Sequence, residues 1–285
     1  MTAVFATGGS SALGLRVLAA LSPHFQLLVA AHRRPVRVPE VETELLPDGL
    51  ERCREYAARI QTAQVVLHLA AATHTSERAE YFHVNTELTK RLLSVCRTGQ
   101  HFIYVSSQSA HPEGGVYGYS KWLAEEAVRA SGLDYTIVRL AEVYGSKDDQ
   151  GIDLLIAFAR RTRLLIDFRN PTSVRYAPIA LDEAAEFVTK IVLQPAWARR
   201  NYTLCADHSC TALDMARALR YSVRPVCVVP VPVFPLRIIA KLPLPLPFKL
   251  DQLDRLVVLK NYDNSAARQD YGFRPKSFLD YLARH

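Results

Sequence analysis

The sequence has none of the cysteine patterns that mark a disulfide scaffold or a zinc site. Its 285 residues include five cysteines, an odd number, and neither a CxxC pair nor a paired His/Cys spacing occurs. Reduced thiols in a cytoplasmic protein are the simplest interpretation. We therefore expect no metal site.

The sequence also lacks a secretory signal and an apolar run that could span a membrane. The segment TAVFATGG, which begins at Thr2, has neither the basic region nor the longer apolar stretch of such a signal. The most apolar stretch, residues 223–248, carries seven prolines, and prolines break a spanning helix. We predict no transmembrane segment and interpret this stretch as irregular chain that is buried or faces a ligand, with a membrane-peripheral surface as the alternative.

A long basic run is missing as well, although the formal net charge is +7. The positive residues are scattered along the chain, which argues against a nucleic-acid groove. A small-molecule substrate that bears phosphate fits this charge better. Hydrophobic residues make up 49% of the chain and charged residues 22%, which is ordinary for a soluble globular protein.

What the first half of the sequence does contain is a regular alternation of apolar runs and amphipathic stretches. Apolar runs predict strands at residues 2–7, 26–31, 41–46, 65–71, 101–106 and 135–139. Helical spacing predicts helices at residues 12–21, 81–96 and 117–130. Because this alternation is typical of a parallel sheet with helices on both faces, we predict the α/β class and a Rossmann-type doubly wound sheet.

After about residue 145 the alternation is looser. We expect helices at 154–163, 181–193 and 211–219, a short strand at 201–205, and further helical segments at 265–271 and 277–283. We therefore assign residues 1–150 to a dinucleotide-binding Rossmann domain, to which a strand and a helix from 174–193 can return. Residues 151–285 are expected to form mainly a smaller, less regular substrate-binding region over the carboxyl edge of the sheet.

The segment TGGSSALG, residues 7–14, has the spacing of a phosphate-binding loop between a strand and a helix. Gly8 and Gly14 occupy its first and third glycine places, whereas Ser11 replaces the middle glycine. A pyrophosphate would lie at the helix N-terminus, where free N–H groups and the dipole favour negative charge. A plain strand-to-helix turn is the alternative. The candidate cofactor contacts here are Gly8, Ser10, Ser11, Ala12, Leu13 and Gly14.

The end of the second predicted strand favours NADP over NAD. An acidic residue at this place binds the ribose 2′-hydroxyl of NAD, whereas arginine suits the 2′-phosphate of NADP. The chain has LLVAAHRRP here, without an acid, so Arg33 and Arg34 are candidate 2′-phosphate contacts. A solvated loop is the other interpretation of both arginines, and NAD stays open. Asp48, after the third strand, is placed either to meet the adenine edge or to form a turn.

The segment VYGYSKW, residues 116–122, contains a candidate proton carrier. Tyr117 and Lys121 are four residues apart and so share a helix face, whereas Tyr119 has no such partner. A nearby ammonium lowers the pKa of a phenol toward working pH, and Lys121 could also hold the nicotinamide ribose. In isolation, a surface tyrosine beside a solvated lysine is the alternative.

Ser106 and Ser107 end the fifth predicted strand, ten or eleven residues before Tyr117. In such a fold a hydroxyl at the carboxyl end of a strand points into the ligand crevice. Either serine could hydrogen-bond the substrate oxygen that Tyr117 protonates or deprotonates.

These motifs and several others resemble one family along nearly the whole chain. The matching segments are TGGSSALG, VVLHLAA, VNTELTKRLL, YVSSQSA, YGYSK, RLAEVYG, SVRYAPIALDEAAEFV and YGFRPKSFLDYL. Together they resemble the extended short-chain dehydrogenase/reductase family, the NAD-dependent epimerase/dehydratase group. The resemblance implies a catalytic triad of Ser107, Tyr117 and Lys121, of which Tyr117 and Lys121 also meet the cofactor. It further implies cofactor-lining or supporting roles for His68, Leu69, Ala70, Ala71 and Asn85.

The departures from the family pattern bear on the substrate. Leu140 and Glu142 replace a proline and an asparagine, and a glutamate there would repel the diphosphate of a sugar nucleotide. Arg175 argues the other way, because it matches a family arginine that contacts substrate phosphate; an ordinary ion pair is its alternative role. Gln108 stands where dehydratases carry an acidic pair, so 4,6-dehydration is not expected. The candidate substrate contacts are Thr73, Gln108, Glu142 and Arg175.

These features predict an NAD(P)-dependent oxidoreductase that reduces a ketone or oxidises a secondary alcohol, with a 4-keto sugar nucleotide as the first substrate. The alternatives are a sugar-nucleotide epimerase, a dehydrogenase of a hydrophobic, sterol-like alcohol, and a non-enzymatic NADP-binding redox sensor. The resemblance also implies a homodimer formed through the helices at 81–96 and 117–130.

Overall fold

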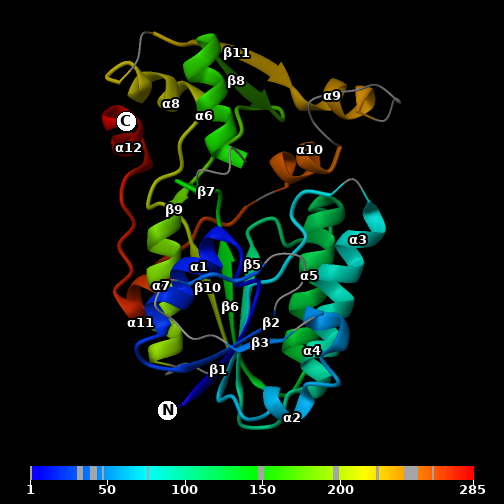
Figure 1. The fold of residues 1–285 in the computed structure, drawn as a ribbon. Helices are drawn as coiled ribbons and strands as arrows, with labels where there is room; N and C mark the ends of the chain where they lie inside the picture. Colours follow the sequence, from blue (N-terminus) through cyan, green and yellow to red (C-terminus); the bar gives the residue numbers. More distant parts are fainter. Residues whose placement is uncertain are drawn as a thin grey trace.

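The computed structural model describes residues 2–30, 35–38, 44–46, 48–75, 77–146, 151–194, 199–222, 225–240, 250–258 and 260–285. These residues form a seven-stranded parallel sheet in the order β10-β6-β5-β4-β1-β2-β3 (Figure 1). The strands of this sheet are β1 (Ala3–Thr7), β2 (Gln26–Ala30), β3 (Glu44–Leu46), β4 (Val65–His68), β5 (His101–Ser107), β6 (Asp134–Leu140) and β10 (Arg200–Leu204).

Short, continuous apolar runs explain why these strands pair in parallel. Val4, Phe5 and Ala6 of β1 are at most 1% exposed, so both faces of the strand are covered, as is usual for parallel sheets. The order of the first six strands is that of a doubly wound sheet, whose direction of winding reverses between β1 and β4. The predicted α/β class and Rossmann-type sheet are confirmed.

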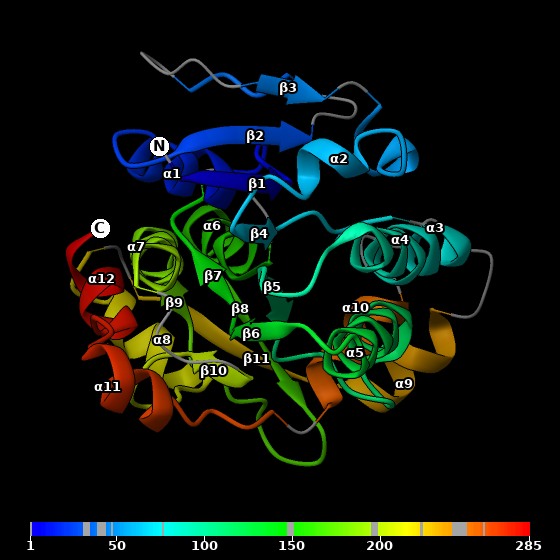
Figure 2. The same ribbon diagram turned by 90° about the horizontal axis from the view of Figure 1, so that it is seen from below.

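Helices cover both faces of the sheet (Figure 2). On one face α1 (Ala12–Leu21) packs beside α7 (Leu181–Leu193), with α11 (Ser265–Tyr271) nearby. On the other face lie α2 (Ala57–Ile60), α4 (Leu88–Val95) and α5 (Gly115–Ala130), preceded along the chain by the short helix η1 (Gly49–Arg52). Because a helix that follows a parallel strand starts at the carboxyl edge, α1 and α5 both begin at that edge of the sheet.

The helix predicted at 81–96 is interrupted by a π-helical turn. It consists of α3 (Arg78–Phe82), the π segment His83–Glu87 and α4, and the N–H of Leu88 bonds back to the carbonyl of His83. Such turns are rare and often lie at functional sites. Here the turn contains Asn85, which is fully buried.

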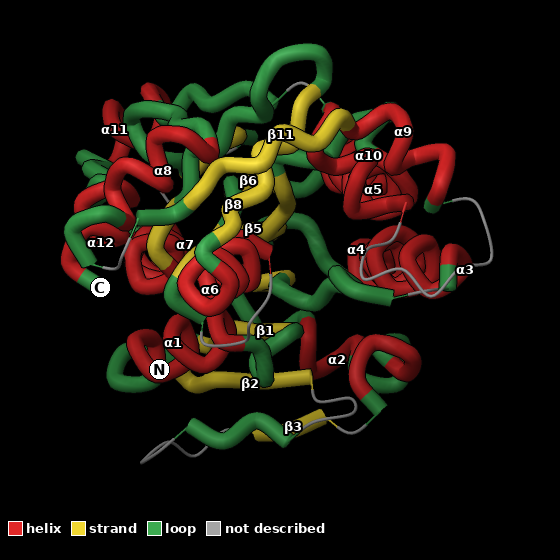
Figure 3. Tube along the Cα trace, turned by 90° about the horizontal axis from the view of Figure 1, so that it is seen from above, coloured by secondary structure: helices red, strands yellow, loops and turns green. Residues whose placement is uncertain are grey.

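The second half of the chain contributes to the sheet and also forms a smaller layer over its carboxyl ends (Figure 3). The helix α7 and the strand β10 return to the sheet, where β10 pairs with β6. The smaller layer has its own apolar core. Its elements are β7 (Val143–Tyr144), α6 (Gly151–Thr162), β8 (Leu164–Arg169), β9 (Ile179–Ala180), α8 (Ala212–Leu219), β11 (Cys227–Pro232), α9 (Val233–Ile239), α10 (Leu250–Val257) and α12 (Phe278–Arg284).

The interpretation of residues 223–248 as irregular chain is wrong for the part that the structure describes. β11 pairs with β8 in a two-stranded parallel sheet and carries Pro230 and Pro232. Proline is tolerated in such a strand because it lies at an edge. Pro235 lies in the first turn of α9, where its missing N–H costs nothing. Across the described part of the chain, no helix has the length and apolar character needed to cross a bilayer.

Candidate active site

The turn between β1 and α1 leaves no room for a side chain at Gly8 or at Gly14. Gly8 has a φ of +71°, and a Cβ on it would lie 2.5 Å from the backbone nitrogen of Ala70 at the end of β4. A Cβ on Gly14 would lie 2.4 Å from the carbonyl oxygen of Gly8. Both glycines therefore allow backbone to approach backbone, as a phosphate-binding turn requires.

Ser11, in the place of the middle glycine, caps α1. Its Oγ accepts a hydrogen bond from the N–H of Gly14 at 3.0 Å and donates one to the carbonyl of Gly8 at 2.8 Å. The first turn of α1 contains no acidic residue, so the positive end of the helix dipole is not neutralised there. This glycine cradle at a helix N-terminus fits a dinucleotide diphosphate.

The other predicted cofactor contacts are distributed around this turn. Leu69 is held to β1 by a bond from its N–H to the carbonyl of Thr7, and Ala70 bonds the Thr7 hydroxyl at 3.2 Å. Asp48 has a φ of 60°, and its carboxylate pairs with Arg52 at 2.9 Å. Arg33 and Arg34 lie outside the described residues.

A buried polar network fixes the end of β4. The two ring nitrogens of His68 lie 2.6 Å from the hydroxyl of Thr7 and 2.8 Å from that of Thr89. Burial, aided by the nearby charge of Lys121, lowers the pKa of His68 to about 3, so the ring is neutral. Through these two hydroxyls, the neutral imidazole links β4 to β1 and α4.

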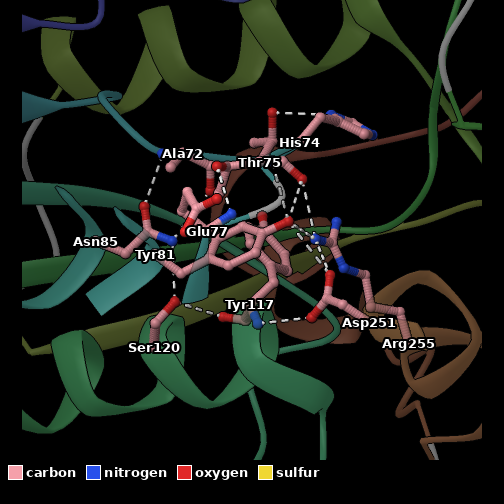
Figure 4. A network of polar contacts seen from close by, with 11 residues as sticks. Ala72, His74, Thr75, Glu77, Tyr81, Asn85, Tyr117, Ser120, Asp251 and Arg255 are labelled. Atoms are coloured by element: carbon pink, nitrogen blue, oxygen red, sulfur yellow. Dashed lines mark hydrogen bonds and ion pairs between the residues drawn. The ribbon is translucent and has the colours of Figure 1, made fainter. Parts of the chain in front are cut away.

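Asn85 joins the loop after β4 to α5 (Figure 4). Its Oδ1 accepts from the N–H of Ala72 at 2.8 Å, and its Nδ2 donates to the carbonyl of Ala72 and to the hydroxyl of Ser120. Ser120 in turn donates to the carbonyl of Tyr117 at 2.7 Å. The asparagine therefore positions the helix turn that carries Tyr117.

Tyr117 and Ser107 face each other at the carboxyl edge of the sheet. Tyr117 is 8% exposed and lies near Ser107, the last residue of β5. Burial raises the pKa of Tyr117 above its ordinary value, whereas the Arg255 guanidinium and the Ser107 hydroxyl oppose that rise. Helix α5 can approach this strand end because of Gly118, on which a Cβ would lie 2.1 Å from the carbonyl oxygen of Ser109.

Lys121 shares a helix with Tyr117, but its ammonium contacts other groups. Its Nζ donates to the carbonyl of Val105 at 2.8 Å and lies 4.1 Å from the ring centroid of Tyr104. The side chain is buried, and burial lowers its pKa to about 7, although Glu125 opposes this shift. The four-residue spacing therefore predicts that Tyr117 and Lys121 share a helix, but it does not predict where the ammonium of Lys121 points.

Two residues that the sequence did not single out complete the surroundings of Tyr117. Asp251 and Arg255 lie one turn apart on α10 and form an ion pair. The carboxylate of Asp251 accepts the N–H of Tyr117 at 2.8 Å, and the guanidinium carbon of Arg255 lies 3.8 Å from the centroid of the Tyr117 ring. The four-residue spacing of an acid and a base was the available signal, but it does not name the partner helix.

The predicted substrate contacts divide into two groups. The carbonyl of Thr73 accepts at 2.9 Å from Arg255, whose guanidinium lies over the ring of Tyr117. Gln108 is 6% exposed, and its Nε2 has no hydrogen-bond partner among the described residues. Glu142 and Arg175 belong to a separate cluster.

In that cluster the carboxylate of Glu142 is paired with Lys260 and accepts a bond from Tyr262. Arg175 donates to the hydroxyl and the carbonyl of Ser209 at 2.8 and 2.7 Å. Lys260 offsets the negative charge of Glu142, which weakens the expected repulsion of a diphosphate. The sequence did not identify Lys260.

Comparisons with known proteins agree with this architecture. The model of the RmlD substrate binding domain family matches residues 1–243. The chain is similar to a curated ceramide reductase from Caulobacter vibrioides, with 29% identity over 184 residues, and the match spans 63% of this chain but only 57% of that protein.

Solved structures with the same fold cover nearly the whole chain. MoeE5 in complex with UDP-glucose and NAD has a TM-score of 0.73 and 17% identity, with 98% of this chain and 96% of that one covered. UDP-glucuronic acid 4-epimerase from Bacillus cereus, in complex with UDP-glucuronic acid and NAD, has a TM-score of 0.74 and 16% identity, with 99% and 97% covered. At these identities the likeness concerns the fold.

Proposed function

The chain belongs to the RmlD substrate binding domain family, and from this membership we propose that it interconverts a ketone and a secondary alcohol with NAD(P) as hydride carrier. The match confirms the predicted resemblance to extended short-chain dehydrogenases/reductases and the prediction of an enzyme of this type. The observation that carries the proposal is the buried Tyr117 near Ser107, at the same carboxyl edge of the sheet as the glycine turn after β1.

In the proposed reaction each side chain has a distinct task. A bound dinucleotide supplies or accepts the hydride. Tyr117 gives its phenolic proton to the substrate oxygen during reduction and takes it back during oxidation. Ser107, near Tyr117 at the end of β5, orients the same oxygen. Lys121, one helical turn after Tyr117, supplies a basic nitrogen that is hydrogen-bonded to the carbonyl of Val105.

We propose NADP as the cofactor, with NAD as the alternative. The support is the missing acidic residue at the end of β2, where an acid would favour NAD. The fold neighbours described above carry NAD in their complexes. Comparing the binding of NADPH and NADH to the purified protein decides between them.

A 4-keto sugar nucleotide remains the first proposed substrate. The family match and the sugar nucleotides bound in the fold neighbours support this class. The pairing of Glu142 with Lys260 removes one objection to a diphosphate.

A hydrophobic alcohol or ketone is the second candidate. It is favoured by the similarity to a ceramide reductase and by exposed apolar side chains on α9, where Phe234 is 70% and Ile238 is 54% exposed. The helix α9 packs against α10, which carries Arg255 over Tyr117. An apolar surface so close to the site suits a lipid-like substrate better than a sugar.

The proposal is tested by following dinucleotide oxidation with a panel of 4-keto sugar nucleotides and long-chain ketones. Tyr117→Phe should lower turnover by about 10²–10⁴-fold, because the proton donor is lost, while dinucleotide binding persists. Tyr119→Phe is the matched control and should retain activity, since the ring of Tyr119 packs on Trp122 and Phe82.

Other outcomes identify the alternatives. Stereochemical inversion without net dinucleotide consumption would favour the epimerase. Dinucleotide binding with no turnover on any substrate, unchanged in Tyr117→Phe, would favour the redox sensor. We also propose a homodimer through the α3–α4 and α5 faces, which size-exclusion chromatography with light scattering can check.

A further inference from the structure

In the described part of the chain, two basic side chains lie near the proposed proton carrier, and one of them contacts its ring. The ammonium of Lys121 is bound to the carbonyl of Val105 and lies over the ring of Tyr104. The guanidinium of Arg255 lies over Tyr117 itself, with 3.8 Å between its central carbon and the ring centroid. At this distance a cation is attracted to the aromatic face, and more strongly where water is excluded.

The position of Arg255 is fixed by contacts that converge on one nitrogen of its guanidinium, Nη2 (Figure 4). Its Nη2 donates to the hydroxyl of Tyr81 at 2.8 Å and to the carbonyl of Thr73 at 2.9 Å, and it pairs with Asp251. Asp251 is in turn bound to the backbone N–H of Tyr117. Because both ends of this chain of contacts meet at Tyr117, the guanidinium and the phenol are held as one unit.

The N-terminus of α5 is shaped to accept α10. Gly115 has a φ of +69°, and a Cβ on it would lie 2.9 Å from Cβ of Asp254 and 3.1 Å from the carboxylate of Asp251. A side chain there would push α10 away from the ring of Tyr117. The missing side chain at 115 is therefore a condition for the Arg255 contact.

We propose that Arg255 is a positioning residue for Tyr117. The guanidinium of Arg255 stabilises the phenolate that remains when Tyr117 gives up its proton. The inference rests on the proposed function. In the reduction step the O–H bond of Tyr117 breaks, an O–H bond forms on the substrate, and the negative charge stays on the phenol oxygen. A cation fixed over the ring favours that charge distribution.

Among the residues that the structure describes, the other groups that face Tyr117 supply no second fixed positive charge at its ring. From β5, Ser107 is uncharged and lowers the pKa of Tyr117, and Tyr104 is neutral, with burial raising its pKa. From α3, Tyr81 is also neutral, again because burial raises its pKa. Within α5, Lys121 is bound to Val105 as described above.

Asp251 on α10 is the opposing charge. It raises the pKa of Tyr117, whereas Arg255 lowers it. Replacing the guanidinium by an uncharged side chain should therefore leave Asp251 unopposed and favour the protonated phenol.

The test uses protein labelled with ¹³C at tyrosine Cζ, without dinucleotide or substrate. The resonance of Tyr117 is assigned from its loss in Tyr117→Phe. At a fixed alkaline pH where the protein stays folded, Arg255→Met should lower the deprotonated fraction of Tyr117 about tenfold, the effect of a one-unit rise in pKa. Arg255→Lys, which keeps a positive charge, should restore most of that fraction.

The matched control is Arg237→Met. Arg237 lies on α9 and pairs with Asp254 of α10 at 2.8 Å, so its loss loosens the same helix without removing the charge over the ring. We expect no change in the Tyr117 resonance. An equal loss of phenolate in this control, or none in Arg255→Met, would overturn the proposal.

A second readout separates this inference from the proposed function. If a substrate alcohol has been found, the pH profile of kcat/KM for its oxidation should move about one unit to higher pH in Arg255→Met. The resonance titration does not depend on any substrate, so absence of turnover would count against the proposed function and not against the role of Arg255.

Discussion

The helices α1 and α5 both begin at the carboxyl edge of the sheet, but the residues that cap their N-termini come from different parts of the sequence. In α1 the cap is local, since Ser11 accepts the N–H of Gly14 three residues away. In α5 the N-cap residue Gly114 offers no side chain, and the N–H of Tyr117 is taken by Asp251, 134 residues further along the chain.

This difference shows that the positive ends of the two helix dipoles are used in different ways. A helix N-terminus attracts an anion, whether that anion is a ligand or a side chain. Ser11 is uncharged, so α1 keeps its positive end for a diphosphate. Asp251 is charged, so α5 has its anion built in, and this anion brings Arg255 to Tyr117. The N-terminus of α1 is arranged to bind a ligand, whereas that of α5 holds Asp251 and Arg255 beside Tyr117.

The largest test of this contrast concerns the α1 end. Gly8→Ala should weaken dinucleotide binding severely and lower the free energy of unfolding by about 4 kcal/mol, because the new Cβ meets backbone at Ala70 in a left-handed conformation. Isothermal titration with the dinucleotide and chemical denaturation measure both effects.

The control is Gly132→Ala. Gly132 has a similar φ, +76°, but no atom lies within 4 Å of an added Cβ, so only the backbone strain of about 1 kcal/mol should appear. Equal losses in the two variants would mean that the close approach to β4 does not matter.

A second prediction sharpens the contrast in charge. Burial lowers the pKa of Lys121 in α5 to about 7, whereas the unfolded amine titrates near pH 10.4. Between these values the unfolded chain binds more protons, so the free energy of unfolding should rise with pH across this window, by about 5 kcal/mol.

Lys121→Met should remove this rise. Its stability advantage over the natural sequence should be greatest near pH 7 and should shrink toward pH 10, as urea denaturation at several pH values would show. Parallel curves for the two proteins would mean that the buried amine is not neutralised by folding.

The smallest effects come from the caps themselves. Asp251→Asn keeps an acceptor oxygen but loses the charge, and Ser11→Ala loses a neutral cap; each should cost about 1 kcal/mol of unfolding free energy. The variants should differ in function, because Asp251→Asn should lower turnover and Ser11→Ala should weaken dinucleotide binding. If Asp251→Asn weakened dinucleotide binding more than Ser11→Ala did, the two termini would not have separate uses.

The same contrast explains what the sequence could predict. The glycine turn was predictable because its contacts join neighbouring residues or the adjacent strand, and its spacing is itself a physical requirement. Tyr117 and Lys121 could be placed on one helix by their four-residue spacing. The contact of the Lys121 ammonium with Val105 depends on the width of the space between α5 and β5, which spacing does not encode.

The contribution of α10 could not be predicted for a related reason. The segment that carries Asp251 and Arg255 has a helical pattern, but its docking on α5 depends on the missing side chain of Gly115 far earlier in the chain. β11 was missed because prolines count against a strand until it is known to lie at an edge.

The pairing of β10 with β6 has a consequence for how the molecule can be made or altered. While the chain leaves the ribosome, the free edge of β6 has no neighbour until residue 204 has been added. A fragment ending near residue 150 would present that edge to other molecules, and open edges promote aggregation. Exchanging the substrate-binding half for that of a relative would therefore have to carry a sheet strand along with it.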